Sequence, residues 1–189
     1  MRKKSFKDNL KYGQIGQDVV LNYLERDWNF SFVSGERKSV IQNMEFVEEV
    51  EGCKYLFPIP GIRPPSLEFV IDGKKDVVTL PDLFVSHDFY DKFFWIEAKR
   101  QEGYSPWLNI GEHSFDSYEK MYRYTRNEFK VSLIFYPYEK DLSVFDIYSV
   151  DMGKLIRNKK DARFGYYRWS VKRTMDRMNK KHLVFEDYI

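Results

Sequence analysis

Two apolar segments of strand length lie close together in the chain, and each carries charge where a buried strand normally has none. The first, Leu80–Val85, contains Asp82 directly after Pro81. The second, Phe93–Arg100, ends in Glu97-Ala98-Lys99-Arg100. A charge buried at a strand end is costly to desolvate unless a counter-charge or a bound ion compensates it. We therefore expect these charges to face one another or a ligand.

The polar residues 86–91 between the two segments predict a turn, so the segments are expected to be antiparallel neighbours. This pairing places Asp82 across from the Glu97–Lys99 end of the second segment, while strand alternation puts Glu97 and Lys99 on one face. Two converging carboxylates suit Mg²⁺ or Mn²⁺, and Lys99 would then face a phosphate and an attacking water. The pattern indicates phosphodiester hydrolysis. The alternative is a solvated strand end, because Glu-x-Lys after an aspartate is common in a chain with 32% charged residues.

The remaining sequence predicts an α/β domain with a mixed sheet flanked by helices. An elaborated loop is expected at residues 35–66, and a glycine- and proline-containing loop at 100–112. Helices are expected at 12–26 and 114–129. Strands are expected at 29–33, 67–71, 76–80, 92–99, 131–137 and 143–150. The last segment, 151–181, is expected to be a basic helical tail.

In the spacing of Asp82, Glu97 and Lys99 the chain resembles the PD-(D/E)xK nuclease superfamily, which has the restriction-endonuclease-like αβββαβ core. The motif reads Pro81-Asp82, fourteen intervening residues, then Glu97-Ala98-Lys99. The resemblance implies that Asp82, Glu97 and the backbone carbonyl of Ala98 hold Mg²⁺ or Mn²⁺, and that Lys99 is catalytic. It covers roughly residues 12–135, and it implies a deoxyribonuclease, with an endonuclease favoured over an exonuclease.

The chain departs from that family on the first helix. Many members carry a glutamate there that reaches the metal, whereas Gln17 occupies the matching position. A glutamine carbonyl can ligate weakly or hold a water, and Asp18 or Glu25 could substitute. The departure keeps open a second reading, a nuclease fold that binds nucleic acid without cutting it. A third is a structural or interaction protein in which Asp82, Glu97 and Lys99 only pair with one another.

Basic and aromatic side chains predict where a nucleic acid would bind. From Lys154 to Lys181, eleven basic residues stand against two acidic ones, with Tyr and Trp between them. On the second helix Tyr118 and Tyr122 either border the site or belong to the core. The expected nucleic-acid contacts are Lys120, Arg123, Tyr104, Trp107, Arg168, Lys172 and Arg173.

Bulk properties limit the remaining possibilities. A chain of 189 residues suits one domain, 1–189, with a core at about 12–150 and the basic helical extension at 151–189. A single cysteine and the lack of an apolar leader or membrane span favour the cytoplasm. The sequence contains no Gly-rich phosphate-binding loop, so we expect no nucleotide cofactor. DNA is the expected partner, RNA stays open, and a small domain that cuts both strands is expected to form a homodimer.

Overall fold

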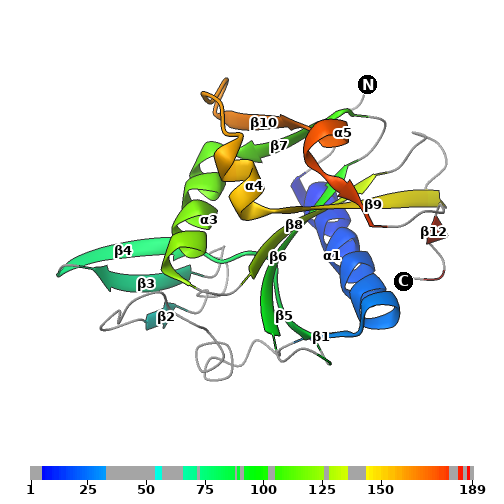
Figure 1. The fold of residues 1–189 in the computed structure, drawn as a ribbon, viewed down its shortest axis with the longest axis horizontal. Coiled ribbons are helices and arrows are strands. Elements are labelled where there is room, and N and C mark those ends of the chain that lie inside the picture. Colours follow the sequence, from blue (N-terminus) through cyan, green and yellow to red (C-terminus); the bar gives the residue numbers. More distant parts are fainter. Residues whose placement is uncertain are drawn as a thin grey trace.

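The computed structural model describes residues 6–32, 54–56, 66–71, 73–87, 89, 92–101, 105–125, 128–135, 144–178, 183–184 and 187. These residues form an α/β fold around a central mixed sheet (Figure 1). Its strands are β1 (Phe30–Phe32), β5 (Leu83–His87), β6 (Lys92–Gln101), β8 (Glu128–Phe135), β9 (Val144–Asp151), β11 (Asp176–Arg177) and β12 (Leu183–Val184). The strand order is β1-β5-β6-β8-β9-β11, with β12 also pairing with β9.

Two smaller sheets and four helices complete the described structure. One sheet contains β2 (Lys54–Leu56), β3 (Ser66–Ile71) and β4 (Lys74–Thr79), and the other pairs β7 (Trp107–Gly111) with β10 (Tyr166–Ser170). The helices are α1 (Phe6–Trp28), α3 (Glu112–Tyr124), α4 (Met152–Arg157) and α5 (Val171–Thr174).

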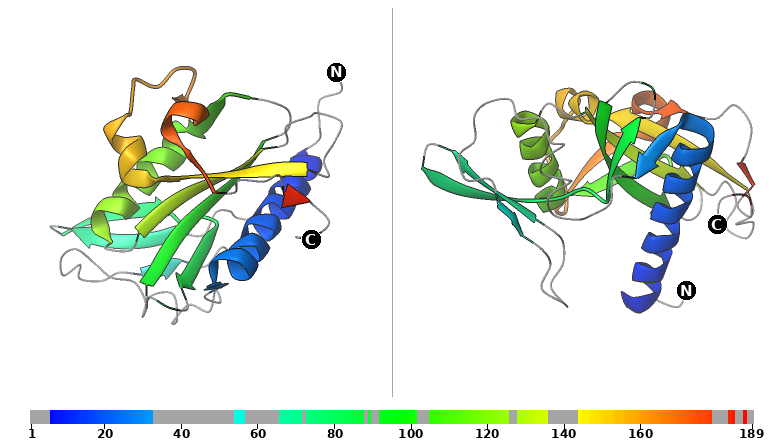
Figure 2. Two further views of the ribbon diagram at one scale, coloured as in Figure 1. Left: turned by 45° about the vertical axis from the view of Figure 1, so that its right-hand side comes forward. Right: turned by 90° about the horizontal axis from the view of Figure 1, so that it is seen from below.

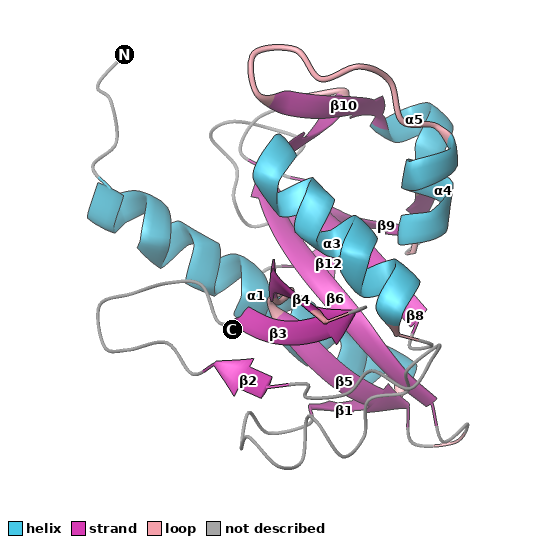
Figure 3. Cartoon of the chain, turned by 90° about the vertical axis from the view of Figure 1, so that its left-hand side faces the viewer, coloured by secondary structure: helices cyan, strands magenta, loops and turns pink. Residues whose placement is uncertain are grey.

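Strand alternation divides the core between the two faces of the central sheet. Leu83 and Val85 of β5 pack with α1, whereas Phe84 between them belongs to the cluster that includes α3 and β10. Figure 3 shows α3 crossing one face of the sheet, with α1 on the other side. In β6 the same alternation sends Ile96 toward α1 and Trp95 toward α3. The face that carries Trp95 also carries Glu97 and Lys99.

The two charged segments pair as the sequence predicts. Strands β5 and β6 are antiparallel, with Leu83 opposite Ile96 and His87 opposite Lys92. Strands β6 and β8 are parallel, and α3 lies between them in the chain. An α/β fold with a central mixed sheet is therefore confirmed.

The strands expected at 67–71 and 76–80 form an antiparallel hairpin, since Ile71 pairs with Lys74 across a turn in which Gly73 has a φ of 71°. Its strands do not join the central sheet, however. They form the separate sheet with β2, which projects from the body of the molecule (Figure 2). Of the loop expected at 35–66, the structure describes only residues 54–56, which form β2, and Ser66, which begins β3.

The first helix is longer than predicted and ends where Asn29 adopts a left-handed φ of 52°. Its close approach to the sheet depends on Gly16. A Cβ atom added there would lie 2.9 Å from the Cβ of Arg100 on β6, whereas one added at Gly13 would meet nothing within 4 Å. Gly16 therefore lies at the close contact between helix and sheet, and Gly13 does not.

The second predicted helix was too long. It ends at Tyr124, where Thr125 is extended, and Phe129 belongs to β8. The loop expected at 100–112 was also wrong in part, because it contains β7.

The prediction of a helical tail at 151–181 was wrong as well. Its described residues, 151–178, contain the short helices α4 and α5 with β10 between them, followed by β11. In β10 Tyr167 and Trp169 alternate with exposed residues and face the core, which is the pattern of a strand. The core therefore continues past residue 150.

No helix in the described part of the chain is both long enough and apolar enough to cross a membrane.

Candidate active site

Asp82 lies at the entry to β5 and is held by two donors. The backbone N–H of Ala98 donates to its Oδ2 at 3.0 Å, and Nε2 of Gln17 donates to its Oδ1 at 2.6 Å. The first contact ties the carboxylate to β6, and the second ties it to α1. Continuing the register of β5 and β6 by one residue sets Asp82 opposite Glu97. The sequence-predicted juxtaposition is therefore present.

Glu97 and Lys99 extend from β6 on the same face. The Glu97 residue is only 2% exposed, and its Oε1 forms an ion pair with Nζ of Lys99. A buried carboxylate without a partner would be strongly destabilising, so Lys99 compensates it. Burial acts to lower the pKa of Lys99, but the charge of Glu97 and its hydrogen bond outweigh burial and raise that pKa.

Tyr118 of α3 closes the site from the other side. Its hydroxyl interacts with Glu97 and Ser114, and its pKa lies well above the ordinary value because of burial first and the charge of Glu97 second. The phenol therefore keeps its proton and donates to the carboxylate. The sequence left Tyr118 open between core and site; it is buried and reaches Glu97. Tyr122 instead lies against α4, where its hydroxyl fills the space that a Cβ at Gly153 would need.

The electrostatics of the site disfavour the simultaneous ionisation of Asp82 and Glu97. Asp82 is an exposed residue, but its carboxylate oxygens face inward to Gln17 and to the backbone of Ala98. Burial of the carboxyl group and, second, the charge of Glu97 raise the pKa of Asp82 to about 7. A divalent cation would favour the ionised form of both acids.

The donor set fits a hard divalent cation. Asp82 and Glu97 offer carboxylate oxygens, and Mg²⁺ characteristically uses one or two protein carboxylates and completes its shell with water and phosphate oxygens. Among the described residues, no group of three or more His, Cys, Asp and Glu side chains is placed to hold a metal. Within the part of the chain that the structure describes, the site offers the two acidic side chains of Asp82 and Glu97.

The helix position that departs from the nuclease family does belong to the site. Gln17 contacts Asp82 directly, so its amide group occupies the place where a third acid was expected. Asp18 faces elsewhere on the helix and accepts from Nε2 of Gln14 at 3.0 Å, and Glu25 is exposed. Neither contacts Asp82 among the described hydrogen bonds.

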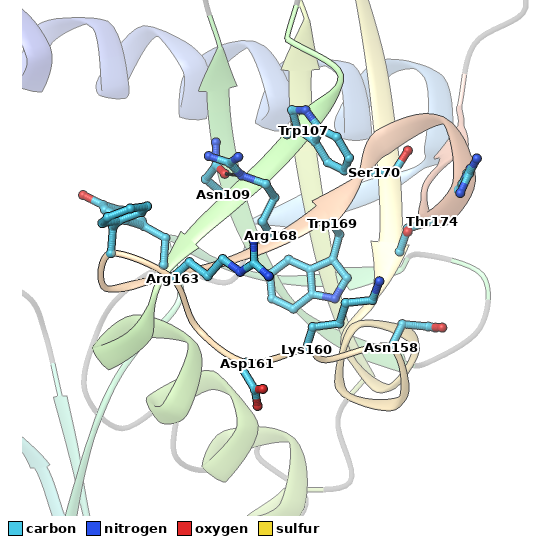
Figure 4. Close-up of a pocket in the computed structure, with 13 residues that line it drawn as sticks. Trp107, Asn109, Asn158, Lys160, Asp161, Arg163, Arg168, Trp169, Ser170 and Thr174 are labelled. Carbon is cyan, nitrogen blue, oxygen red and sulfur yellow. Dashed lines mark hydrogen bonds between the residues drawn. The ribbon is translucent and has the colours of Figure 1, made fainter.

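The predicted nucleic-acid contacts separate into two groups. Lys120 pairs with Asp76 of β4 at 2.7 Å, and Arg123 pairs with Glu119 on its own helix. Trp107, Arg168 and Arg173 line one hollow on the β7–β10 sheet (Figure 4), and Lys172 is exposed on α5 beside it. Tyr104 lies outside the described residues.

Comparison of the chain with protein-family models, with curated proteins and with solved structures found no match.

Proposed function

We propose that the protein is a metal-dependent nuclease with a restriction-endonuclease-like core that hydrolyses phosphodiester bonds in DNA. The observation that carries the proposal is the convergence of Asp82, Glu97 and Lys99 at the paired start of β5 and middle of β6. Such a set combines oxygen ligands for a cation with a lysine beside them.

Asp82 and Glu97, with the backbone carbonyl of Ala98, would hold Mg²⁺ or Mn²⁺. A divalent cation there would act as a Lewis acid on the phosphate and lower the pKa of a bound water. The hydrogen bonds from Ala98 and Gln17 fix the orientation of Asp82, and Tyr118 does the same for Glu97. Lys99, whose ammonium group now pairs with Glu97, supplies positive charge for the attacking water and for the charge that develops on the phosphate.

A second candidate is a protein with the same fold that binds DNA without cutting it. The observation that favours it is the amide of Gln17 beside Asp82, where the resemblance leads us to expect a third acid. The two candidates differ in how they respond to loss of the acids. A binder keeps its affinity for DNA when Asp82 and Glu97 are replaced by Asn and Gln, and it cuts no DNA at any metal concentration.

The test is a screen of linear, branched, overhanging and single-stranded DNA with Mg²⁺ or Mn²⁺, with EDTA as the metal-free control. Glu97→Gln and Lys99→Ala are compared with the unchanged protein, and Lys74→Ala, on the exposed β3–β4 hairpin, serves as a control for the loss of a lysine. We expect metal-dependent cleavage that both site variants lose and the control keeps. Absence of cleavage for every DNA form with either metal would overturn the proposal.

A further inference from the structure

The hollow beside β10 has the shape and the charge of a binding site. It encloses about 1300 Å³ between the β7–β10 sheet, the segment after α4, and α5. Its lining carries four cationic side chains, Lys160, Arg163, Arg168 and Arg173, against one acid, Asp161. A concave surface with this excess of positive charge favours a polyanion.

Strand alternation leaves aromatic rings exposed in that hollow. On β7 and β10 the core takes Leu108, Ile110, Tyr167 and Trp169, so the opposite face carries Trp107 at 43% exposure and Tyr166 at 54%. Rings that half face solvent beside cations are typical of surfaces on which unpaired bases stack.

Arg168 is already oriented on this face. Its guanidinium lies 5.9 Å from the ring centre of Trp107, and its Nε donates to Oδ1 of Asn109 at 2.8 Å (Figure 4). The hydrogen bond and the cation–π contact fix the arginine while leaving other donors of the guanidinium for a phosphate.

Phe164 stands at the rim in a conformation that packing does not explain. It is 99% exposed, and its φ of 54° is in the left-handed region, as is that of Gly165 at 77°. Arg163 and Tyr166 exchange backbone hydrogen bonds of 3.0 and 3.1 Å around these two residues, which makes a tight two-residue turn. Such turns favour Asn-Gly or Gly-Gly, and a phenylalanine at positive φ is an outlier. The turn therefore presents a fully exposed ring at a position where asparagine would be the better residue for stability.

We propose that this hollow binds an unpaired DNA strand, and that Phe164 stacks on the base at the point where the strand leaves a duplex. In a duplex the base faces are already stacked on one another, so exposed rings gain contacts only from unpaired bases. The inference rests on the proposed function in one respect, that the bound strand belongs to the substrate of the nuclease. The preferred substrate would then be overhanging or forked DNA.

Helix α3 connects the hollow to the candidate active site. Phe115 packs against Tyr167 and Trp169 of β10, with ring centres 4.9 and 5.0 Å apart. Tyr118, one turn further along the same helix, contacts Glu97. A strand seated on β10 would thus be held by the same helix that orients the proposed metal ligand.

The test is the binding of labelled DNA in EDTA, followed by fluorescence anisotropy, so that no cleavage is required. Single-stranded DNA and a duplex with an overhang are compared with a blunt duplex of equal length, and single-stranded RNA forms a further arm. We expect the two DNAs with unpaired bases to bind roughly 5- to 150-fold more tightly than the blunt duplex, as one or more stacked bases would give. Equal affinity for the blunt duplex, or binding of RNA alone, would overturn the inference.

Phe164→Asn separates function from folding. Asparagine suits the left-handed turn, so the variant should unfold at the same temperature or higher and yet lose roughly 5-fold or more of the affinity for overhanging DNA. The matched control is Phe89→Ala, which removes another exposed ring, 72% exposed, in the turn between β5 and β6. An unchanged affinity in Phe164→Asn, or an equal loss in Phe89→Ala, would contradict the role of the ring.

Arg168→Ala gives an independent readout. Loss of one phosphate contact should lower the slope of log affinity against log salt by about 0.7 for single-stranded DNA, and Lys74→Ala should leave the slope unchanged. If the unpaired strand binds as described but Mn²⁺ yields no cleavage, the proposed function fails and the binding site stands. If Mn²⁺ yields cleavage while Phe164→Asn and Arg168→Ala bind normally, the binding site fails and the nuclease stands.

Discussion

Asp82 accepts two hydrogen bonds that each come from a different element, and this shared anchoring makes the site sensitive to single residues. Gln17 supplies one of them from α1, and Ala98 supplies the other from β6. At the scale of single side chains, the site contains two acids, one lysine, one amide and one phenol.

Gln17→Glu tests whether the helix position belongs to a metal site. In EDTA a third carboxylate beside Asp82 adds like-charge repulsion and should lower the melting temperature. With Mn²⁺ the added ligand should bind the cation, so the variant should gain more melting temperature from the metal than the unchanged protein does. Thermal unfolding with and without metal measures both effects. Gln17→Met removes the amide without adding charge, and an equal gain from Mn²⁺ in that control would argue against ligation at residue 17.

At the scale of helices and strands, α1 is held against β6 by the small size of Gly16. Gly16→Ala places a Cβ 2.9 Å from that of Arg100 and should lower the free energy of unfolding by about 1–3 kcal/mol through overpacking. Gly13→Ala, on the same helix with nothing within 4 Å, should instead raise it by roughly 0.5–1 kcal/mol. Urea denaturation of both variants gives the comparison, and equal effects of the two would contradict the close approach at Gly16.

Lys159 connects α3 with the segment that precedes β10. Its ammonium lies 3.0 Å from Oε2 of Glu119, 4.4 Å from the ring centre of Tyr167 and 5.0 Å from that of Phe115. Burial acts to raise the pKa of Glu119, but the hydrogen bond from Lys159 and the charges of Lys159 and Arg123 outweigh it, so the pKa lies below its ordinary value of 4.5.

This lowered pKa predicts how stability depends on pH. Because the unfolded chain takes up the proton more readily, the contribution of Glu119 is fully present above pH 4.5 and is lost as the pH falls through the folded-state pKa. Urea denaturation at a series of decreasing pH values through this window should show a smaller fall in the free energy of unfolding for Glu119→Gln than for the unchanged protein. Glu25→Gln, exposed on α1, should behave like the unchanged protein. If the free energy of unfolding fell equally in Glu119→Gln and in the unchanged protein, Glu119 would not contribute to the pH dependence.

The sequence predicted the elements whose signals are local. The segments around Asp82 and Glu97 are adjacent in the chain, so the turn between them was enough to predict that they pair antiparallel and that Asp82 lies near the end that carries Glu97. The pairing of β7 with β10 could not be predicted in this way, because Arg168 lies opposite Asn109, far away in sequence. Short strands with one apolar face depend on such a partner, and without it Tyr166–Ser170 was interpreted as helix.

The same limit applied within the candidate site. Asp82, Glu97 and Lys99 were predicted from charge at the ends of apolar strands, and Gln17 from the resemblance to the nuclease superfamily. The contact between Tyr118 and Glu97 joins a helix to a strand, and helical spacing alone could not distinguish it from core packing. The exposure of Phe164 was hidden for a different reason, since only the backbone conformation shows that the ring sits in a left-handed turn.

At the scale of the whole molecule, the described segment 151–178 contributes side chains to the core. Trp169 is 3% exposed, and its Nε1 donates to the carbonyl of Leu155 at 3.2 Å. Trp169→Ala should therefore lower the free energy of unfolding by about 3–5 kcal/mol. Trp107→Ala, on the open face of the same small sheet, should change it by only about 0.5 kcal/mol. Chemical denaturation distinguishes the two, and a small effect at Trp169 would mean that β10 is not anchored in the core.

The account as a whole depends on Asp82 acting as a metal ligand in a nuclease. The most direct measurement is the initial rate of DNA cleavage as a function of Mn²⁺ concentration, for the unchanged protein and for Asp82→Asn on the same DNA. We predict a saturable dependence on Mn²⁺ in the unchanged protein and a rate at least about 100-fold lower in Asp82→Asn, since loss of residues that only orient metal ligands already costs 10- to 100-fold. Cleavage by Asp82→Asn at the unchanged rate, or cleavage that persists in EDTA, would contradict the role of Asp82 as a metal ligand.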